Sequence, residues 1–294
     1  MTTPTTNETI IEQNGVLVGA YRAPRNLAAN QRGSIHDDKV ATKLGFRGGT
    51  VAGSIHMEQF PPLLVHAFGE RWFETGSLSC YFRNATLHGE RVRALAQAPS
   101  GKSDEQVNIW MEREDGMQVL EGTASVGAPA APSMLARKLA EPRDPGELRI
   151  LAHLSAGESL DAVPSRLDFD AHTSARLDAL TEPMAWYRDG SPWADAIVNP
   201  GLLVHMMVAI QPRMRLRDRA VGLYGAIEVR HINGPVFMER DYEISGTVLT
   251  MGATPKTEYV WYETLMREPG GRDIASMMMM LRFMKASSPL WAEA

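Results

Sequence analysis

The sequence is nearly free of cysteine, since Cys80 is the only one among 294 residues. A single cysteine excludes an internal disulfide and is typical of a reducing compartment, so we expect a cytoplasmic protein. Long hydrophobic runs are also missing. The longest, GLLVHMMVAI at 201–210, is far shorter than the roughly 20 residues that cross a membrane. The N-terminus lacks the basic and apolar parts of a secretion signal. We therefore expect no membrane partner.

Positive charge is scarce as well. The chain has 30 Lys and Arg against 35 Asp and Glu, which gives a net charge of −5. Binding to nucleic acid normally needs a basic patch, so we expect no nucleic-acid partner. The sequence contains no zinc-ligand spacing, no phosphate-binding glycine loop and no G-x-S-x-G elbow. We accordingly expect neither a metal nor a cofactor.

Alternating apolar and polar residues fill two long parts of the chain. Such runs cover 77–85, 91–98, 106–114 and 117–126, and they recur at 222–232, 241–251, 258–268 and 273–284. Turn residues at 115–116 and 268–273 predict a hairpin in each set. The run MMMM at 277–280 is expected to be a strand buried on both faces. The pattern predicts an α+β protein with antiparallel sheets.

The same order of landmarks occurs twice, which indicates an internal duplication. Arg83 and Arg230 each precede a turn and a second strand, and they lie half a chain length apart. We predict an N-terminal repeat over 1–127, a linker over 128–148 with a short helix in its centre, and a C-terminal repeat over 149–294. The linker is rich in Ala, Pro and charged residues. An additional segment at 181–198 contains two Trp and one Tyr, which predicts a lid or a packing loop.

The stretch around residues 33–60 contains the best candidates for a functional site. His36 precedes a short helical pattern, and Asp37 and Asp38 fall in its first turn. Carboxylates there stabilise the positive end of a helix, so each can serve as a cap or as a catalytic group. Gly53 and Ser54 begin the next helix, where free N–H groups can hold an oxyanion, although small residues there also serve packing.

Residues 30–60 resemble the MaoC-like (R)-specific enoyl-CoA hydratase and dehydratase family of hot-dog proteins. The family has a motif D-x-N-P-I-H, then a short helix ending in G-F, then A-H-G. This sequence keeps the I-H as Ile35-His36, the G-F as Gly45-Phe46 and the alanine as Ala52. The later INGPVF at 232–237 also resembles a strand pair of that family. The resemblance implies a double hot-dog fold, in which each antiparallel sheet wraps around a central helix. It further implies a lyase that adds or removes water beside the activated carbonyl of a small-molecule substrate, such as a CoA or carrier-protein thioester.

The family uses an aspartate and a histidine to hold the water. His36 matches the histidine, but Gln31 stands where the family has aspartate, and an amide cannot act as a general base. The resemblance therefore implies a diverged hydratase or dehydratase with His36 as the acid-base group. Asp37 or Asp38 is a candidate to replace the missing carboxylate. His56 joins Gly53 and Ser54 among the candidate substrate-binding residues.

The second repeat offers a parallel arrangement. His172 stands before a short helical pattern, as His36 stands before its own, and Asp170 precedes it by two residues. A further helix is predicted to begin at Pro200. The pair is either a second carboxylate–histidine site or a structural histidine with its neighbour. Which repeat holds the working site stays open at this point.

Two other functions remain open. A hot-dog thioesterase would use a carboxylate on the central helix, for which Glu58 is the candidate. A non-catalytic hot-dog binding protein would need no acid-base group. Pro61 and Pro62 follow directly and predict a break in the central helix near Gln59. Exposed edges and faces of hot-dog sheets predict a homodimer.

Overall fold

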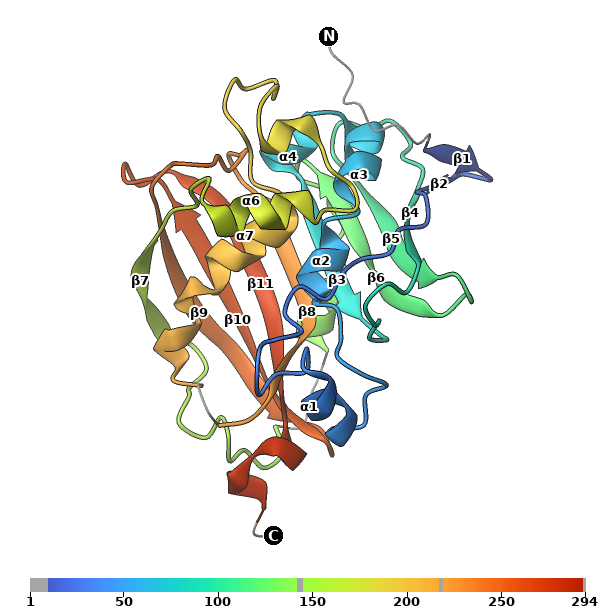
Figure 1. Cartoon of the computed structure of the whole chain (residues 1–294). Coiled ribbons are helices and arrows are strands. Elements are labelled where there is room, and N and C mark those ends of the chain that lie inside the picture. Colours follow the sequence, from blue (N-terminus) through green and yellow to red (C-terminus); the bar gives the residue numbers. More distant parts are fainter. Residues whose placement is uncertain (1–9, 142–144, 217–218, 293–294) are drawn as a thin grey trace.

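The computed structural model describes residues 10–141, 145–216 and 219–292, and it is built around one antiparallel sheet. Within these residues the sheet has eleven strands in the order β1-β2-β4-β5-β6-β3-β8-β11-β10-β9-β7. Figure 1 shows the sheet curving around the helices on its inner face. The α+β class with antiparallel pairing is therefore confirmed.

The strands fall into two sets with matching order. The first set is β3 (Ser77–Phe82), β4 (Val92–Gln97), β5 (Glu105–Arg113) and β6 (Gln118–Val126). The second set is β8 (Gly222–His231), β9 (Tyr242–Ala253), β10 (Thr257–Arg267) and β11 (Asp273–Met284). The two sets meet where β3 pairs with β8, with Leu78 opposite Val229. All eight predicted strands are confirmed, and their mirrored order supports the duplication.

Short strands extend both edges of the sheet. They are β1 (Ile11–Gln13), β2 (Val16–Val18) and β7 (Ser159–Ser165), and the sequence did not predict them. Both predicted hairpins are present, because Gly116 (φ 80°) turns between β5 and β6 and Gly271 (φ 85°) turns between β10 and β11. Positive φ angles of this kind favour glycine.

The central helices lie on the inner face of the sheet. They are α2 (Gly53–Met57), α3 (Pro61–Phe68) and α7 (Pro200–Met207), and α2 contacts α7 where the two repeats meet (Figure 1). Pro61 and Pro62 occupy the first turn of α3, where the missing N–H does no harm, so the chain ends one helix and begins another. The predicted break near Gln59 is confirmed.

Further helices complete the inner layer and the connections. They are α1 (Asp38–Lys43), α4 (Arg71–Thr75), α6 (Ala171–Asp178), η1 (Ala185–Tyr187), η2 (Val208–Met214), η3 (Lys285–Ser287) and η4 (Pro289–Trp291). No helix among the described residues is both long and apolar enough to pass through a bilayer.

The predicted linker contains helix α5 (Met134–Ala140), which contacts β3, β6 and β8. Leu135 of α5 is fully buried in a small cluster with Trp261 and Met280. This cluster is separate from the main core, to which Met277 and Met279 belong. Since neighbouring residues of a strand face opposite sides, β11 is buried on both faces, as predicted. The helix in the linker is confirmed, whereas the domain boundaries themselves stay a prediction.

The segment 181–198 packs against the first repeat. Trp186 and Tyr187 are almost fully buried, and the rings of Trp186, Tyr187 and Trp193 all contact the ring of Phe73 edge-on. Trp193 also donates from its indole N–H to Glu74 at 3.0 Å. These contacts support the packing-loop alternative rather than a lid.

Candidate functional site

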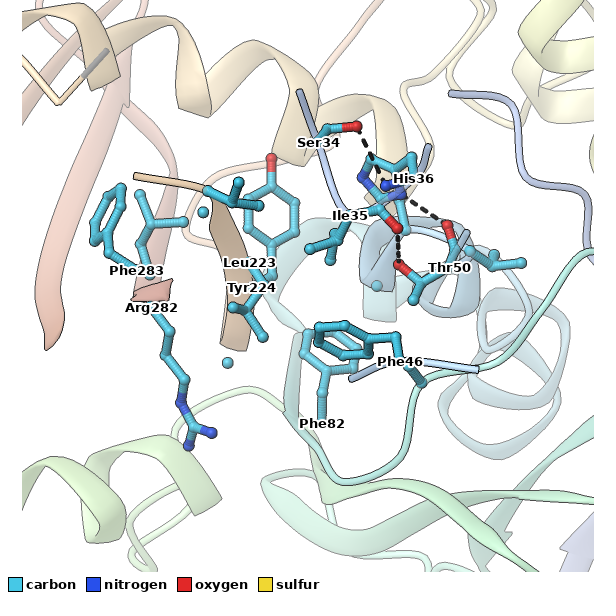
Figure 2. Close-up of a pocket in the computed structure, with 18 of the residues that line it drawn as sticks. Ser34, Ile35, His36, Phe46, Thr50, Phe82, Leu223, Tyr224, Arg282 and Phe283 are labelled. Atoms are coloured by element: carbon cyan, nitrogen blue, oxygen red, sulfur yellow. Dashed lines mark hydrogen bonds between the residues drawn. The ribbon is translucent and has the colours of Figure 1, made fainter. Parts of the chain in front are cut away.

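A cavity of about 720 Å³ lies between the two repeats. The first repeat lines it with Gln31, His36, Gly53, His56 and neighbouring residues, and the second with Val208, Gln211, Tyr224, Phe283 and others. Figure 2 shows His36 of the first repeat and Tyr224 and Phe283 of the second. Among the described residues that line this cavity, none is an aspartate or a glutamate. No described carboxylate is therefore available for acid-base chemistry inside it, which leaves the imidazoles of His36 and His56 and the Tyr224 hydroxyl.

His36 has a defined tautomer. Its Nδ1 lies 2.7 Å from the carbonyl oxygen of Thr50 (Figure 2). Because a carbonyl oxygen only accepts hydrogen bonds, Nδ1 donates the proton in the neutral ring and Nε2 keeps its lone pair. His36 is half-buried on the cavity wall, so Nε2 is available as a proton acceptor.

The loop that carries His36 is held at several points. The His36 N–H donates to Ser34 Oγ at 3.2 Å, and the Ser34 hydroxyl donates to the Gln31 carbonyl at 2.8 Å. On the other side, Asn26 Nδ2 donates to the His36 carbonyl at 2.9 Å. A Cβ on Gly49 would lie 2.3 Å from that same carbonyl oxygen, so the close approach requires glycine. These contacts fix Gln31 and His36 on one loop at the cavity.

The two aspartates after His36 have structural partners instead. Asp37 is the N-cap of α1 and accepts from the N–H groups of Lys39 (2.8 Å) and Val40 (3.3 Å). Asp38 accepts from the Gly49 N–H at 2.6 Å. Neither lines the cavity. The structure thus supports the capping alternative for Asp37. It does not bring Asp37 into the cavity lining, where a replacement for the missing carboxylate would have to lie.

The start of α2 contributes Gly53 to the cavity wall, whereas Ser54 is buried and does not line it. The first N–H groups of a helix have no partner within that helix. A Cβ on Gly53 would lie 2.5 Å from the ring of Phe82, which also lines the cavity. Glycine therefore lets an aromatic ring pack directly against the backbone at the start of α2.

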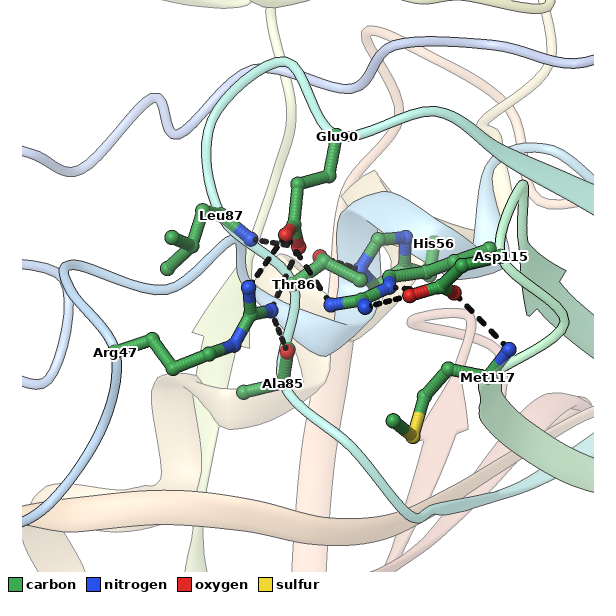
Figure 3. Close-up of polar contacts among 9 residues, drawn as sticks. Arg47, His56, Ala85, Thr86, Leu87, Glu90, Asp115 and Met117 are labelled. Atoms are coloured by element: carbon green, nitrogen blue, oxygen red, sulfur yellow. Dashed lines mark hydrogen bonds and ion pairs between the residues drawn. The ribbon is translucent and has the colours of Figure 1, made fainter.

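His56, on α2, lines the cavity from deeper inside the molecule. Its Nε2 lies 2.8 Å from the Thr86 hydroxyl, and its Nδ1 is buried with no partner among the described residues (Figure 3). Burial lowers the pKa of His56 to about 4, so the ring is neutral at pH 7. The backbone carbonyl of Thr86 accepts a hydrogen bond from the Val51 N–H at 2.9 Å, and this bond holds the chain just before α2.

Acid should destabilise the fold through His56 and His231. Burial lowers the pKa of each to about 4 from 6.5. Between these values the unfolded chain binds protons that the folded chain does not, so stability falls as pH decreases through this window. We expect the free energy of unfolding to drop by about 2 kcal/mol per histidine between pH 7 and pH 5. Urea unfolding at both pH values measures this, and His56→Gln should remove about half of the drop. An unfolding free energy unchanged by pH would contradict it.

An ion-pair network holds the loop that contains Thr86. Glu90 accepts from Arg47 Nη1 (2.6 Å), from Arg113 Nη1 (3.2 Å) and from the Leu87 N–H (2.8 Å) (Figure 3). Arg47 also donates to the Ala85 carbonyl. The hydrogen bond from Arg47 is the main reason that the pKa of Glu90 is lowered. The network fixes the β3–β4 loop against the mouth of the cavity.

The second-repeat candidates lie elsewhere. Asp170 is the N-cap of α6, where it accepts from the Thr173 N–H at 2.7 Å, and it is exposed. His172 is exposed inside α6 rather than before it, so the predicted parallel with His36 is wrong in register. Neither residue lines the cavity. The position before the α6 cap, which corresponds to His36 before the Asp37 cap, is occupied by Phe169.

Glu58 is buried at the contact between α2 and α7. It pairs with Arg176 of α6, with 2.8 Å between Glu58 Oε1 and Arg176 Nη2, and a Cβ on Gly201 would lie 2.0 Å from the same carboxylate. Burial raises the pKa of Glu58, which Arg176 partly offsets. Glu58 does not line the cavity, so it joins the two repeats and is not placed to act on a molecule bound there.

Breaking this ion pair should cost stability. Arg176→Met leaves a buried carboxylate without its cation, and we expect the free energy of unfolding to fall by about 3 kcal/mol. Adding Glu58→Gln should restore much of it, because the remaining charge is then removed as well. Guanidinium unfolding of both single variants and the double variant measures the coupling. If the two losses simply add, the pair is not energetically coupled.

Three features of the site were missed by sequence reasoning. They are the Thr50 carbonyl that orients His36, the partnership of Glu58 with Arg176, and the cavity residues Gln211 and Tyr224 of the second repeat. Helical spacing gave no signal for them, because each depends on segments that only folding brings together.

No protein-family model matches the sequence, and no curated protein matches it. Solved structures do. A protein assigned as a MaoC domain dehydratase from Chloroflexus aurantiacus has a TM-score of 0.60 and 13% identity, covering 93% of this chain and 96% of its own. A conserved hypothetical protein from Mycobacterium tuberculosis, described as a double hotdog fold, has a TM-score of 0.60 and 13% identity, covering 93% and 97%. A protein assigned as an oleoyl thioesterase from Lactobacillus plantarum reaches 0.49 at 12% identity, covering 92% and 98%. The first two similarities extend over nearly the whole chain, and they show that it has the double hot-dog fold, as the sequence predicted.

Proposed function

We propose that this protein is a hydratase or dehydratase of the MaoC type that acts beside the carbonyl of an acyl thioester. The observation that carries the proposal is that His36 and Gly53 line one cavity, with His36 Nδ1 engaged by the Thr50 carbonyl and Nε2 left without a partner among the described residues. A proton acceptor and a helix start that can receive a carbonyl oxygen are the two parts that water addition requires. The likeness in fold to a protein assigned as a dehydratase agrees with this reaction.

The reaction then runs with one acid-base group. His36 Nε2 takes a proton from water while the water oxygen bonds to the β-carbon of an enoyl thioester. Negative charge that develops on the thioester oxygen is stabilised by the Gly53 N–H. The imidazolium returns its proton to the α-carbon, so one water is added in full. Gln31 lines the cavity on the same loop and can hold the water through its amide, but it takes no proton.

The substrate is a small molecule with an apolar chain. Beyond His36, the cavity continues between residues of the second repeat that are mostly apolar, including Val208, Leu223 and Phe283. Such a lining suits the hydrocarbon part of an acyl group. The thioester carrier, CoA or a carrier protein, and the homodimer stay predictions from the sequence.

A panel of thioesters tests the proposal. The purified protein is incubated with enoyl, 3-hydroxyacyl and saturated acyl-CoA, and the loss or gain of the conjugated double bond is followed beside the release of free thiol. Hydration or dehydration without thiol release is the expected result. Thiol release as the main reaction would replace the proposal with a thioesterase. No reaction with any member would favour a binding protein, for which the lack of a cavity carboxylate is the supporting observation.

A further inference from the structure

The part of the cavity formed by the second repeat is not uniformly apolar. Its lining includes Val208, Pro212, Leu216, Leu223 and Phe283, and among them stand the polar side chains Gln211, Tyr224 and Arg282. Arg282 donates from Nη2 to the Tyr81 hydroxyl at 2.9 Å, which leaves Gln211 and Tyr224 to be accounted for. Polar groups in such surroundings are normally hydrogen-bonded, because an unmade bond costs free energy. The atoms of Gln211 and Tyr224 that lack a protein partner therefore indicate which ligand group the cavity can bind.

The amide of Gln211 is held in one orientation. Gln211 Nε2 donates to the Tyr262 hydroxyl at 2.8 Å, and that hydroxyl donates in turn to the sulfur of Met279 at 3.0 Å. Tyr262 is completely buried, so the arrangement is fixed from the core. Since Nε2 faces Tyr262, the acceptor Oε1 is left for the cavity. Among the described residues, none donates a hydrogen bond to it.

Tyr224 supplies a second polar group close by. Its hydroxyl has no hydrogen-bond partner among the described residues, and the side chain lines the same cavity (Figure 2). Leu281 of β11 pairs with Tyr224 of β8 on one side and with Val260 of β10 on the other, so these three side chains lie on one face of the sheet. Tyr262 comes two residues after Val260 in β10 and therefore lies on the same face as Tyr224. Burial raises the pKa of Tyr224, which keeps the hydroxyl protonated and able to donate.

An open acceptor and an open donor in one cavity match a small functional group that can pair with both. A hydroxyl can donate to Gln211 Oε1 and accept from the Tyr224 hydroxyl at the same time. A plain hydrocarbon chain would leave both groups unpaired in an apolar space. We propose that the acyl chain of the substrate carries a hydroxyl group, remote from the thioester carbonyl, that binds between Gln211 and Tyr224. The inference rests on the proposed function, because it names the substrate class of the same cavity.

Binding of matched ligand pairs tests it without turnover. Saturated acyl-CoA thioesters, which cannot be hydrated, are titrated calorimetrically beside hydroxylated partners in which the hydroxyl is moved one carbon at a time from C4 outward, so that no ligand is the 3-hydroxyacyl substrate of dehydration. For at least one position, the wild-type protein should bind the hydroxylated member about 10- to 100-fold more tightly. Gln211→Met and Tyr224→Phe should each reduce that preference to a few-fold or less, while the affinity for the plain chain stays level or improves.

Gln59→Met is the matched control. Gln59 is buried, its amide has no partner among the described residues, and it does not line the cavity, so the same substitution there should leave the preference unchanged. Equal affinity for every pair, a preference that survives Gln211→Met, or no binding of either member would overturn the inference. A preference for the hydroxylated ligand without hydration activity would instead reject the proposed reaction and retain the hydroxyl site. Hydration activity without that preference would retain the reaction and reject the hydroxyl site.

Discussion

Gln31→Asp is expected to raise the rate of enoyl thioester hydration by about two orders of magnitude. Gln31 lines the cavity on the loop that also carries His36, and no described residue of the lining is an acid. An aspartate there would accept a hydrogen bond from the attacking water and share the proton transfer with His36 Nε2. The measurement is kcat/KM with an enoyl-CoA for wild type and variant.

Two further variants make this prediction specific. Gln31→Asn has the same size as Gln31→Asp but no charge, so it should give no gain. Gln31→Asp combined with His36→Ala should remain near the background rate, because the carboxylate has lost its partner. A gain in Gln31→Asn, or no gain in Gln31→Asp, would show that position 31 does not act on the water.

His36→Ala should lower kcat/KM for hydration by about 10²- to 10⁴-fold. His36 is the half-buried imidazole of the cavity with a free Nε2, whereas the second imidazole of the lining, His56, is buried against Thr86. Gln31 cannot take a proton, and burial lowers the pKa of His56 to about 4, so neither group is expected to substitute for His36. Steady-state kinetics with an enoyl-CoA measure the loss, and thermal unfolding checks that the fold is intact.

His172→Ala provides the comparison for that loss. His172 is exposed on α6 and does not line the cavity, so its removal should change kcat/KM less than twofold. If His172→Ala abolished the reaction and His36→Ala did not, the working site would belong to the second repeat. That result would reject the assignment of the cavity.

Much of the fold could be predicted because its signals are local. The alternation of residues such as those of 258–268 has a period of two whether or not the rest of the chain is known, and β10 occupies that range within one residue at each end. Pro61 and Pro62 act on their own helix turn, so the break before α3 was also predictable. The short strands at the edges are too brief and too exposed for such a pattern, and they were missed.

The site was predictable only in part, because its geometry depends on distant segments. The Ile35-His36 match led to His36, but nothing in the sequence says that Thr50 orients its ring. The pair Asp37 and Asp38 could cap a helix or reach a substrate, and only the positions of the α1 and Gly49 N–H groups decide in favour of structural roles. In the sequence Tyr224 looks like any other residue of an alternating strand. Its place in the cavity lining becomes visible only when β8 is packed beside the first repeat.

The pairing of β3 with β8 has a consequence for how such a protein can change over time. Both strands border the cavity, through Phe82 at the end of one and Tyr224 near the start of the other. The residues proposed to make and break bonds belong to the first repeat, while those proposed to select the acyl chain belong to the second. Selection can therefore retune the choice of substrate by substitutions in one gene half without disturbing the chemistry encoded in the other.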